Sequence, residues 1–214
     1  VVRRLEGLLR FRQERFEEAE RAFREAQEAA PRDPEALRWL CRIALVREDA
    51  AEALRLASRI QTLEPGDPEG LFCQALALAS IDRKEEALAA VQALLAAEPG
   101  DRAAGLLGSA ILGELRRFPE AVAMISEVRE RYPEDPEVTF RLGALLEQSG
   151  RVDSALAVFD TLLAAAPDDH RALNYAGYMC IERGIRLEQA VERVRRALEL
   201  EPENGAYLDS YGWG

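Results

Sequence analysis

The sequence predicts an all-α protein made of stacked helical hairpins, because three series of residues recur along its 214 residues with one period. The prolines are spaced by 34, 34, 34, 34 and 35 residues: Pro31, Pro65, Pro99, Pro133, Pro167 and Pro202. A series of alanines has the same period: Ala19, Ala53, Ala87, Ala121, Ala155 and Ala190. A third series always holds a small residue: Gly7, Cys41, Ala75, Ser109, Gly143, Gly177 and Gly212. A fixed period of this size is typical of proteins built from stacked structural repeats.

Residues 33–65 illustrate one repeat. Asp33-Pro34-Glu35 predicts a helix start, since Asp caps free amides, Pro fits the first turn, and Glu favours the positive end of the helix dipole. A first helix is expected to end near Arg47, and a second to cover about 50–63, where apolar residues recur with the helical period. Pro65 then blocks continuation of the helix. Each period is therefore expected to form one helical hairpin, with no competing strand pattern.

The period divides the chain into six repeats, followed by the start of a seventh at residues 205–214 that stops inside its first helix. The six are 1–33, 34–67, 68–101, 102–135, 136–169 and 170–204. The sixth carries one inserted residue between Gly184 and Ala190, which explains the spacing of 35. Gly150 and Gly184 suit the turn inside a hairpin. The unfinished repeat indicates that the chain comes from a longer protein.

The small series and the alanine series have one packing explanation. A small residue in the first helix and an alanine in the second allow the two helices of a hairpin to approach closely. A bulky residue at either place would overpack the contact at a cost on the order of 1–3 kcal/mol.

This pattern resembles the tetratricopeptide repeat family, in which a small residue marks the first helix, an alanine, an aromatic and another alanine mark the second, and a proline closes the unit. Residues 5–31 match through Gly7, Phe16, Ala19, Phe23, Ala26 and Pro31. Residues 136–167 match through Leu142, Gly143, Gly150, Ala155, Phe159 and Pro167. Residues 173–178 and 204–213 are similar to a variant common in proteobacterial repeat proteins, many of them associated with the cell envelope. The resemblance implies a right-handed α-α superhelix of antiparallel hairpins whose first helices line a concave groove.

The register that the family implies predicts the residues of a partner-binding groove, with arginines at the N-terminal end, apolar residues in the middle and an aromatic residue beyond them. They are Arg4, Arg12, Arg38, Arg42, Phe72, Leu76, Leu106, Phe140, Asn174 and Tyr178. Such a groove suits a peptide or amphipathic helix with apolar anchors and an acidic end. Two alternatives remain open. Phe72, Leu106 and Phe140 could pack between adjacent first helices, and the arginines could form a solvated face paired with neighbouring glutamates.

Composition favours a protein partner over other classes of ligand. The net charge of −11 argues against nucleic acid, which requires clustered positive charge. No run of about 18 apolar residues is present, so direct membrane insertion is not expected. An upstream signal or lipid anchor stays open, and the compartment could be cytoplasmic or periplasmic.

Catalysis and cofactor binding are not expected. His170 is the single histidine, placed in a turn after Asp168-Asp169 where it is expected to face solvent, and no zinc-ligand spacing surrounds it. There is no phosphate-binding glycine loop, and a serine nucleophile would lack a base. We therefore expect neither an enzyme nor a cofactor or metal site.

The three cysteines are expected to be buried reduced thiols, with a bridge between Cys41 and Cys73 as the alternative. The functional hypothesis is an interaction scaffold that binds a partner peptide or helix as part of a larger bacterial assembly protein. The alternative is a structural module that forms homo-oligomers through its uncapped repeat ends.

Overall fold

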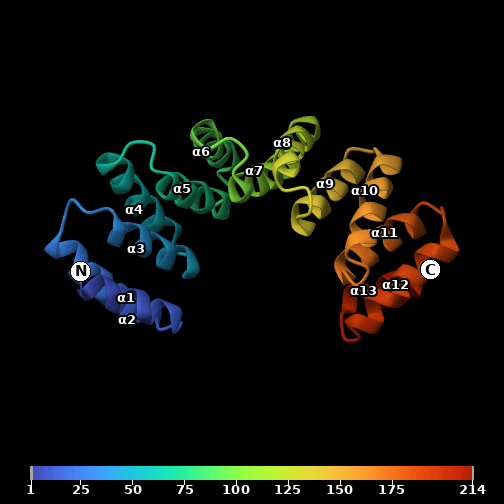
Figure 1. Cartoon of the computed structure of the whole chain (residues 1–214), viewed down its shortest axis with the longest axis horizontal. Coiled ribbons are helices and arrows are strands. Elements are labelled where there is room, and N and C mark those ends of the chain that lie inside the picture. The colour runs from blue at the N-terminus through green and yellow to red at the C-terminus, as the bar shows by residue number, and fades with distance from the viewer. Residues whose placement is uncertain (1, 214) are drawn as a thin grey trace. The chain divides into compact units, whose positions relative to one another are not determined.

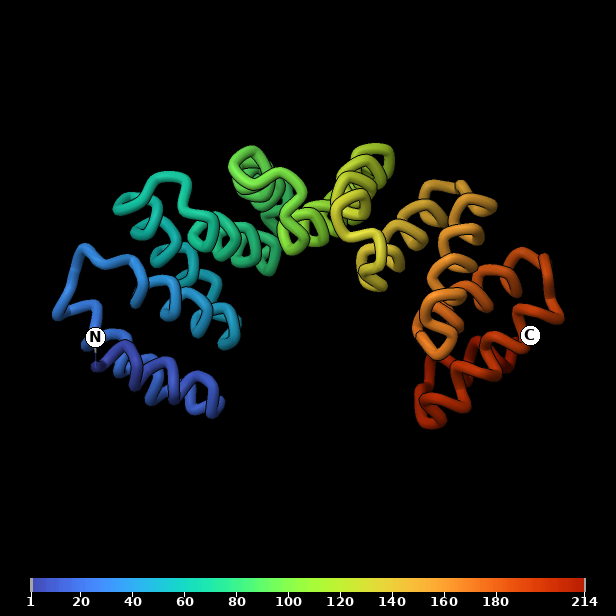
Figure 2. The backbone as a smooth tube through the Cα atoms, viewed as in Figure 1, coloured from blue at the N-terminus to red at the C-terminus, as the bar shows by residue number. Residues whose placement is uncertain are grey.

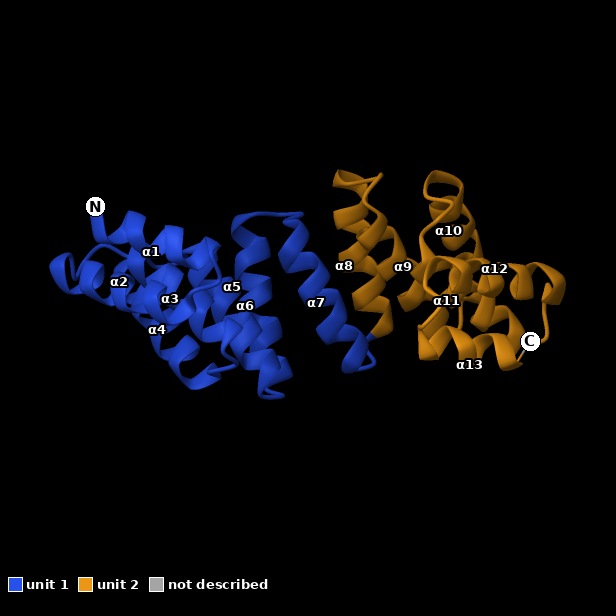
Figure 3. Cartoon of the chain, turned by 90° about the horizontal axis from the view of Figure 1, so that it is seen from below, with its two compact units in different colours: residues 1–117 blue, residues 118–214 orange. Residues whose placement is uncertain are grey.

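The computed structural model describes residues 2–213, which contain thirteen helices and no strand (Figure 1). The chain divides into two compact units, residues 1–117 and residues 118–214, which we call unit 1 and unit 2 (Figure 3). Each unit is described by itself below.

Unit 1 consists of seven helices, and its first six form three hairpins, α1 with α2, α3 with α4, and α5 with α6 (Figure 2). The helices are α1 (Val2–Arg12), α2 (Phe16–Ala29), α3 (Glu35–Val46), α4 (Ala50–Leu63), α5 (Pro68–Ser80), α6 (Lys84–Ala97) and α7 (Arg102–Glu114). The expected bounds of the helices in residues 33–65 are confirmed to within a residue or two.

Unit 2 consists of six helices, with hairpins formed by α9 with α10 and by α11 with α12. The helices are α8 (Phe118–Arg131), α9 (Pro136–Gln148), α10 (Val152–Ala165), α11 (His170–Glu182), α12 (Leu187–Leu200) and α13 (Gly205–Trp213). Helices α7 and α8, which the period assigns to one repeat, therefore belong to different units.

Asp33, which the sequence predicts to start a helix, accepts a hydrogen bond from the Glu35 amide at 3.1 Å, and aspartates whole periods later start further first helices. The carboxylate of Asp67 accepts a hydrogen bond from the amide of Gly70 at 2.7 Å, and that of Asp101 accepts from Ala104 at the same distance. Asp135 and Asp169 cap α9 and α11 in the same way. These bonds satisfy amides that have no partner within the helix.

The small series lies at close helix contacts. A Cβ atom added to Gly7 would lie 2.8 Å from the Phe23 ring, and one added to Gly177 would lie 2.6 Å from the Val194 side chain. Every alanine of the alanine series is at most 1% exposed. The packing explanation is confirmed at these positions. Gly212 differs, because an added Cβ would meet no atom within 4 Å.

The hairpin turns use a left-handed residue at one recurring position. Gly150 and Gly184 hold φ angles of 80° and 66°, which confirms their predicted role. In unit 1 the same position is held by non-glycine residues with φ between 58° and 62°: Glu14, Glu48, Asp82 and Arg116. The inserted residue of the sixth repeat lies in this turn too, where Arg186 also has a positive φ of 48°.

The prediction of three reduced cysteines is wrong for two of them. Cys41 on α3 and Cys73 on α5 form a disulfide, with their Cα atoms 6.5 Å apart and both side chains buried. The physical reason is that α3 and α5 pack against each other and bring these two positions within disulfide range. Cys180 is buried and free, as expected, and burial raises the pKa of its thiol.

Candidate functional site

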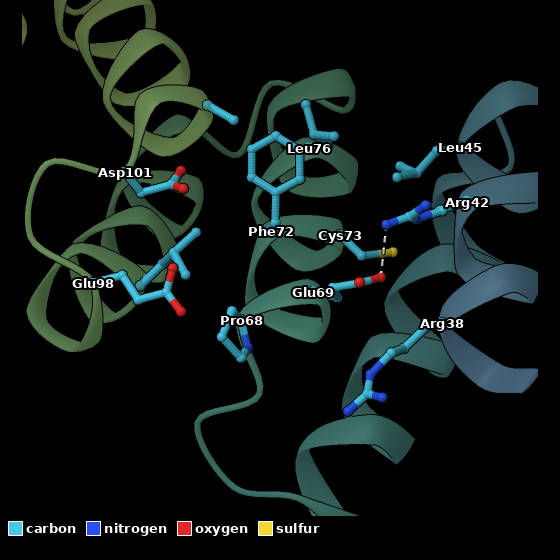
Figure 4. Close-up of a pocket in the computed structure, with 12 residues that line it drawn as sticks. Arg38, Arg42, Leu45, Pro68, Glu69, Phe72, Cys73, Leu76, Glu98 and Asp101 are labelled. Atoms are coloured by element: carbon cyan, nitrogen blue, oxygen red, sulfur yellow. Dashed lines mark hydrogen bonds and ion pairs between the residues drawn. The ribbon is translucent and has the colours of Figure 1, made fainter. Parts of the chain in front are cut away.

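A pocket of about 410 Å³ lies in unit 1 between α3, α5, the end of α6 and the link to α7 (Figure 4). Leu45, Phe72, Leu76 and Leu94 give it an apolar floor. Phe72 and Leu76 are four residues apart on one face of α5, so they point the same way while Cys73 and Ala77 face the core. Both remain half-buried, and their free surface is available to a partner.

Arg38 enters the pocket from α3 and is held by three carboxylates. Its guanidinium donates to Asp67 at 2.5 and 3.1 Å, to Glu64 at 2.5 Å and to Glu35 at 3.1 Å. Asp67 is only 7% exposed, so this pair lies largely out of solvent. The hydrogen bond to Asp67 is the main cause that raises the pKa of Arg38, and burial opposes it. The network ties α3 to the beginning of α5.

Arg42, one turn further along α3, is exposed and is also paired. Its guanidinium donates to the Glu69 carboxylate at 2.9 Å, as Figure 4 shows, and lies 4.7 Å from the centre of the Trp39 ring. Such a position over an aromatic face is a favourable cation–π contact. Both arginines of the pocket therefore have carboxylate partners within unit 1.

The structure brings Arg38, Arg42, Phe72 and Leu76 together in this pocket, but other predicted groove residues of unit 1 lie outside it. Arg4 is half-buried and donates to Asp33 at 3.0 Å. Arg12 is exposed at the end of α1, and Leu106 is half-buried on α7.

In unit 2, Phe140 belongs to a cluster of three aromatic rings. Its ring packs edge-on against Phe159 at 5.6 Å and Tyr175 at 5.5 Å between centres, and the Arg171 guanidinium lies 5.3 Å away. The Tyr175 hydroxyl donates to Glu147 at 3.2 Å, and burial raises the pKa of Tyr175 to about 12. These contacts favour the packing alternative for Phe140.

Asn174 and Tyr178 line a second, shallower pocket of about 370 Å³, between α11 and α13 of unit 2. Tyr175, Asp209 and Trp213 border the same pocket. Tyr178 is 41% exposed there. The predicted groove residues of unit 2 thus divide between a packed cluster and an open surface.

The expectation that His170 sits in a turn and faces solvent is wrong. His170 is the first residue of α11, is half-buried, and its Nδ1 lies 2.8 Å from the Tyr207 hydroxyl. Asp169, which precedes it, caps the helix by accepting a hydrogen bond from the Ala172 amide.

Within residues 2–213, no three His, Cys, Asp or Glu side chains gather closely enough to bind a metal ion. None of the helices described in this range has the length and apolar character that crossing a membrane requires.

Sequence reasoning missed several residues that line the pocket, among them two carboxylates beyond the end of α6. Glu98 and Asp101 lie in the link between α6 and α7 and face Phe72 from the side opposite the arginines (Figure 4). The groove register considers first helices only, and so it omits the links. The signal was present, since Glu98 and Asp101 stand one period after Glu64 and Asp67.

Comparison with known proteins identifies the family. The model of the tetratricopeptide repeat matches residues 4–68, 72–136, 111–170 and 143–185. The chain belongs to the tetratricopeptide repeat family. A TPR repeat-containing protein of Pseudomonas aeruginosa is 40% identical over 52 residues, which are 24% of this chain. The match covers only 9% of that relative's length.

Solved structures of similar fold are tetratricopeptide proteins with low sequence identity. PilW, a type IV pilus biogenesis factor, has a TM-score of 0.86 with 15% identity, over 97% of this chain and 96% of that one. MamA from Desulfovibrio magneticus has a TM-score of 0.71 with 20% identity, over 80% and 97%. YrrB, described as having an unusual peptide-binding site, has a TM-score of 0.70 with 19% identity, over 89% and 98%. These likenesses confirm the predicted fold class, an all-α solenoid of tetratricopeptide repeats.

Proposed function

We propose that this chain is a protein–protein interaction scaffold whose unit 1 pocket binds a peptide or helix of a partner. The observation that carries the proposal is the pair Phe72 and Leu76, half-buried on the floor of a 410 Å³ pocket with charged residues at its rim. An apolar centre with a polar rim is the usual anatomy of a protein interface. The tetratricopeptide fold is also consistent with a scaffold for protein interactions.

The proposed partner is a protein and not a nucleic acid. The net charge of −11 would repel a phosphate backbone, and the two arginines of the pocket are paired with carboxylates of unit 1. The apolar floor instead offers a place for a side chain of a peptide.

We place the scaffold in an oxidising compartment, as part of an assembly in a bacterial envelope. Disulfides persist in the periplasm and in secreted proteins and are rare in the cytosol, and Cys41 and Cys73 form one here. The description of PilW as a pilus biogenesis factor agrees with an envelope role. Thiol trapping in the producing cells tests the compartment. Recovery of Cys41 and Cys73 as free thiols would contradict it.

The binding proposal is tested by capturing a partner from the producing organism and titrating it against variants. Phe72→Ala should weaken binding about tenfold or more, because an anchor in an interface centre contributes on the order of 1–3 kcal/mol. Ile81→Ala is the matched control, since Ile81 is an exposed apolar residue of unit 1 that lies outside the pocket. Equal affinity of wild type and Phe72→Ala would place the binding site elsewhere.

Self-association is the second candidate function, and exposed apolar residues on α13 favour it. Leu208 is 53% exposed, Tyr211 is 44% exposed and Trp213 is 79% exposed. A second copy could cover these side chains. Light scattering over a range of concentrations measures the molar mass in solution. A molar mass that stays at the value of the monomer at every concentration would remove this candidate. If dimers form, Trp213→Ser should weaken them.

A further inference from the structure

We propose that the unit 1 pocket selects a basic partner segment, in which an apolar side chain is flanked by lysine or arginine. This inference rests on the function proposed above and specifies the chemistry of the partner. The sequence predicts a partner with an acidic end, because arginines are the only charged residues of the predicted groove.

The arginine side of the pocket, Arg38 and Arg42, has little capacity left for an acidic ligand. Arg38 is hydrogen-bonded to three carboxylates, and Arg42 is bonded to Glu69. An acidic partner would have to displace one of these carboxylates, and the displaced group would then repel it. The net gain from such an exchange is small, because one ion pair is lost for each one formed.

The carboxylate side of the pocket, Glu98 and Asp101, is available. Glu98 is exposed, and Asp101 uses its Oδ1 atom in the α7 cap at 2.7 Å. Within residues 2–213, neither carboxylate pairs with a basic side chain of the chain itself. A basic ligand would therefore meet unpaired negative charge, with no internal pair to break.

Phe72 lies between the arginine side and the carboxylate side of the pocket. Figure 4 shows its ring between Arg42 on one side and Glu98 and Asp101 on the other. A partner side chain that packs on Phe72 and Leu76 would bring the neighbouring residues of its own chain towards the carboxylate side. Charge complementarity of this kind contributes to specificity and to the rate of association.

The test uses a randomised peptide library displayed on phage and selected on the oxidised wild-type chain. Enriched peptides are expected to carry an aliphatic or aromatic residue next to lysine or arginine. Labelled copies are then titrated against wild type and the double variant Glu98→Gln/Asp101→Asn, in which asparagine retains the helix cap. Binding to the variant should fall roughly fivefold and lose most of its salt dependence.

The matched control is Glu28→Gln/Glu48→Gln, which removes two negative charges from unit 1 outside the pocket and should bind as wild type does. Enrichment of acidic peptides, or equal binding of basic peptides to wild type and to Glu98→Gln/Asp101→Asn, would overturn this inference. Loss of binding in Phe72→Ala would in that case still support the pocket itself. Absence of any enrichment, or binding that Phe72→Ala leaves unchanged, would instead contradict the proposed function.

Discussion

The two units build the same hairpin with different residues. Unit 2 turns its two complete hairpins with Gly150 and Gly184, whereas all four equivalent turn residues of unit 1 are larger: Glu14, Glu48, Asp82 and Arg116. A side chain in the left-handed region costs roughly 1–2 kcal/mol per residue. At this turn position unit 1 therefore carries backbone strain that unit 2 avoids, and the one left-handed non-glycine residue described in unit 2 is Arg186, in the turn with the insertion. The comparison shows that the turn position requires a conformation and not a particular residue.

The residues of the small series also differ between the two units, and again it is unit 2 that uses glycine. Unit 2 places glycine at each small position, at Gly143, Gly177 and Gly212, while three of the four in unit 1 carry a side chain. One of those three, Cys41, is used for the disulfide that joins α3 to α5. In unit 1 a covalent link therefore adds to the packing of neighbouring helices, whereas the cysteine described in unit 2, Cys180, is free.

Breaking the disulfide should have the largest effect and should act on unit 1 only. The Cys41→Ser/Cys73→Ser variant should lose about 3–4 kcal/mol of unfolding free energy, as expected for a loop of this length. Calorimetry with and without a reductant measures the change. The reductant should lower the melting temperature of wild type and leave the double serine variant unchanged.

The oxidised state itself can be checked by mass spectrometry of the intact chain. The native mass should be two hydrogens below that of the reduced chain, and one thiol, Cys180, should react with a thiol reagent only after denaturation. Rapid native labelling of Cys41 and Cys73 would mean that the link between α3 and α5 is not formed.

Phe72 and Phe140 stand on equivalent positions of the two units and should respond differently to truncation. Phe140→Ala should cost about 2–3 kcal/mol of stability, because its ring contacts Phe159 and Tyr175. Phe72→Ala should cost roughly half as much, since one side of Phe72 faces the pocket. Urea unfolding followed by circular dichroism compares them. A larger loss for Phe72 would reverse our assignment of packing and binding roles.

Sequence reasoning could not separate these two phenylalanines, because their register is the same. Their neighbours differ. Two periods before Phe159 and Tyr175 the chain carries Val91 and Leu107, so the ring partners of Phe140 become smaller aliphatic residues in unit 1. That difference is readable only after the fold shows which positions contact one another.

Features set by local chemistry were the predictable ones. The helix start at Asp33 and the glycine turn at Gly150 each depend on a few neighbouring residues, and each is confirmed. The disulfide and the carboxylates at Glu98 and Asp101 depend on distances between different helices and links. Periodicity fixes no such distance, and so the prediction of reduced thiols failed and the acidic side of the pocket was missed.

Adding a methyl group at the glycines of unit 2 should have a smaller effect that depends on position. Gly177→Ala should destabilise by about 1–2 kcal/mol, because the new Cβ would meet the Val194 side chain and the Ala190 carbonyl oxygen. Gly212→Ala should stabilise slightly, since its Cβ would enter open space and alanine favours the helix. Thermal melts of both variants give the comparison, and equal melting temperatures would show that unit 2 relaxes around the added methyl.

Exchanging the turn residues between the two units should have the smallest effect on stability. This exchange tests the comparison between glycine and larger turn residues most directly. Glu48→Gly should stabilise unit 1 by about 0.5–1 kcal/mol, because relief of the left-handed strain exceeds the entropy that glycine adds to the unfolded chain. Gly150→Ala should destabilise unit 2 by a similar amount, with no steric contact involved, since an added Cβ would meet no atom within 4 Å. Denaturant titrations of both variants measure the two changes. Opposite signs would attribute the difference to backbone conformation, whereas a loss of stability in Glu48→Gly would mean that the Glu48 side chain contributes more than its strain costs.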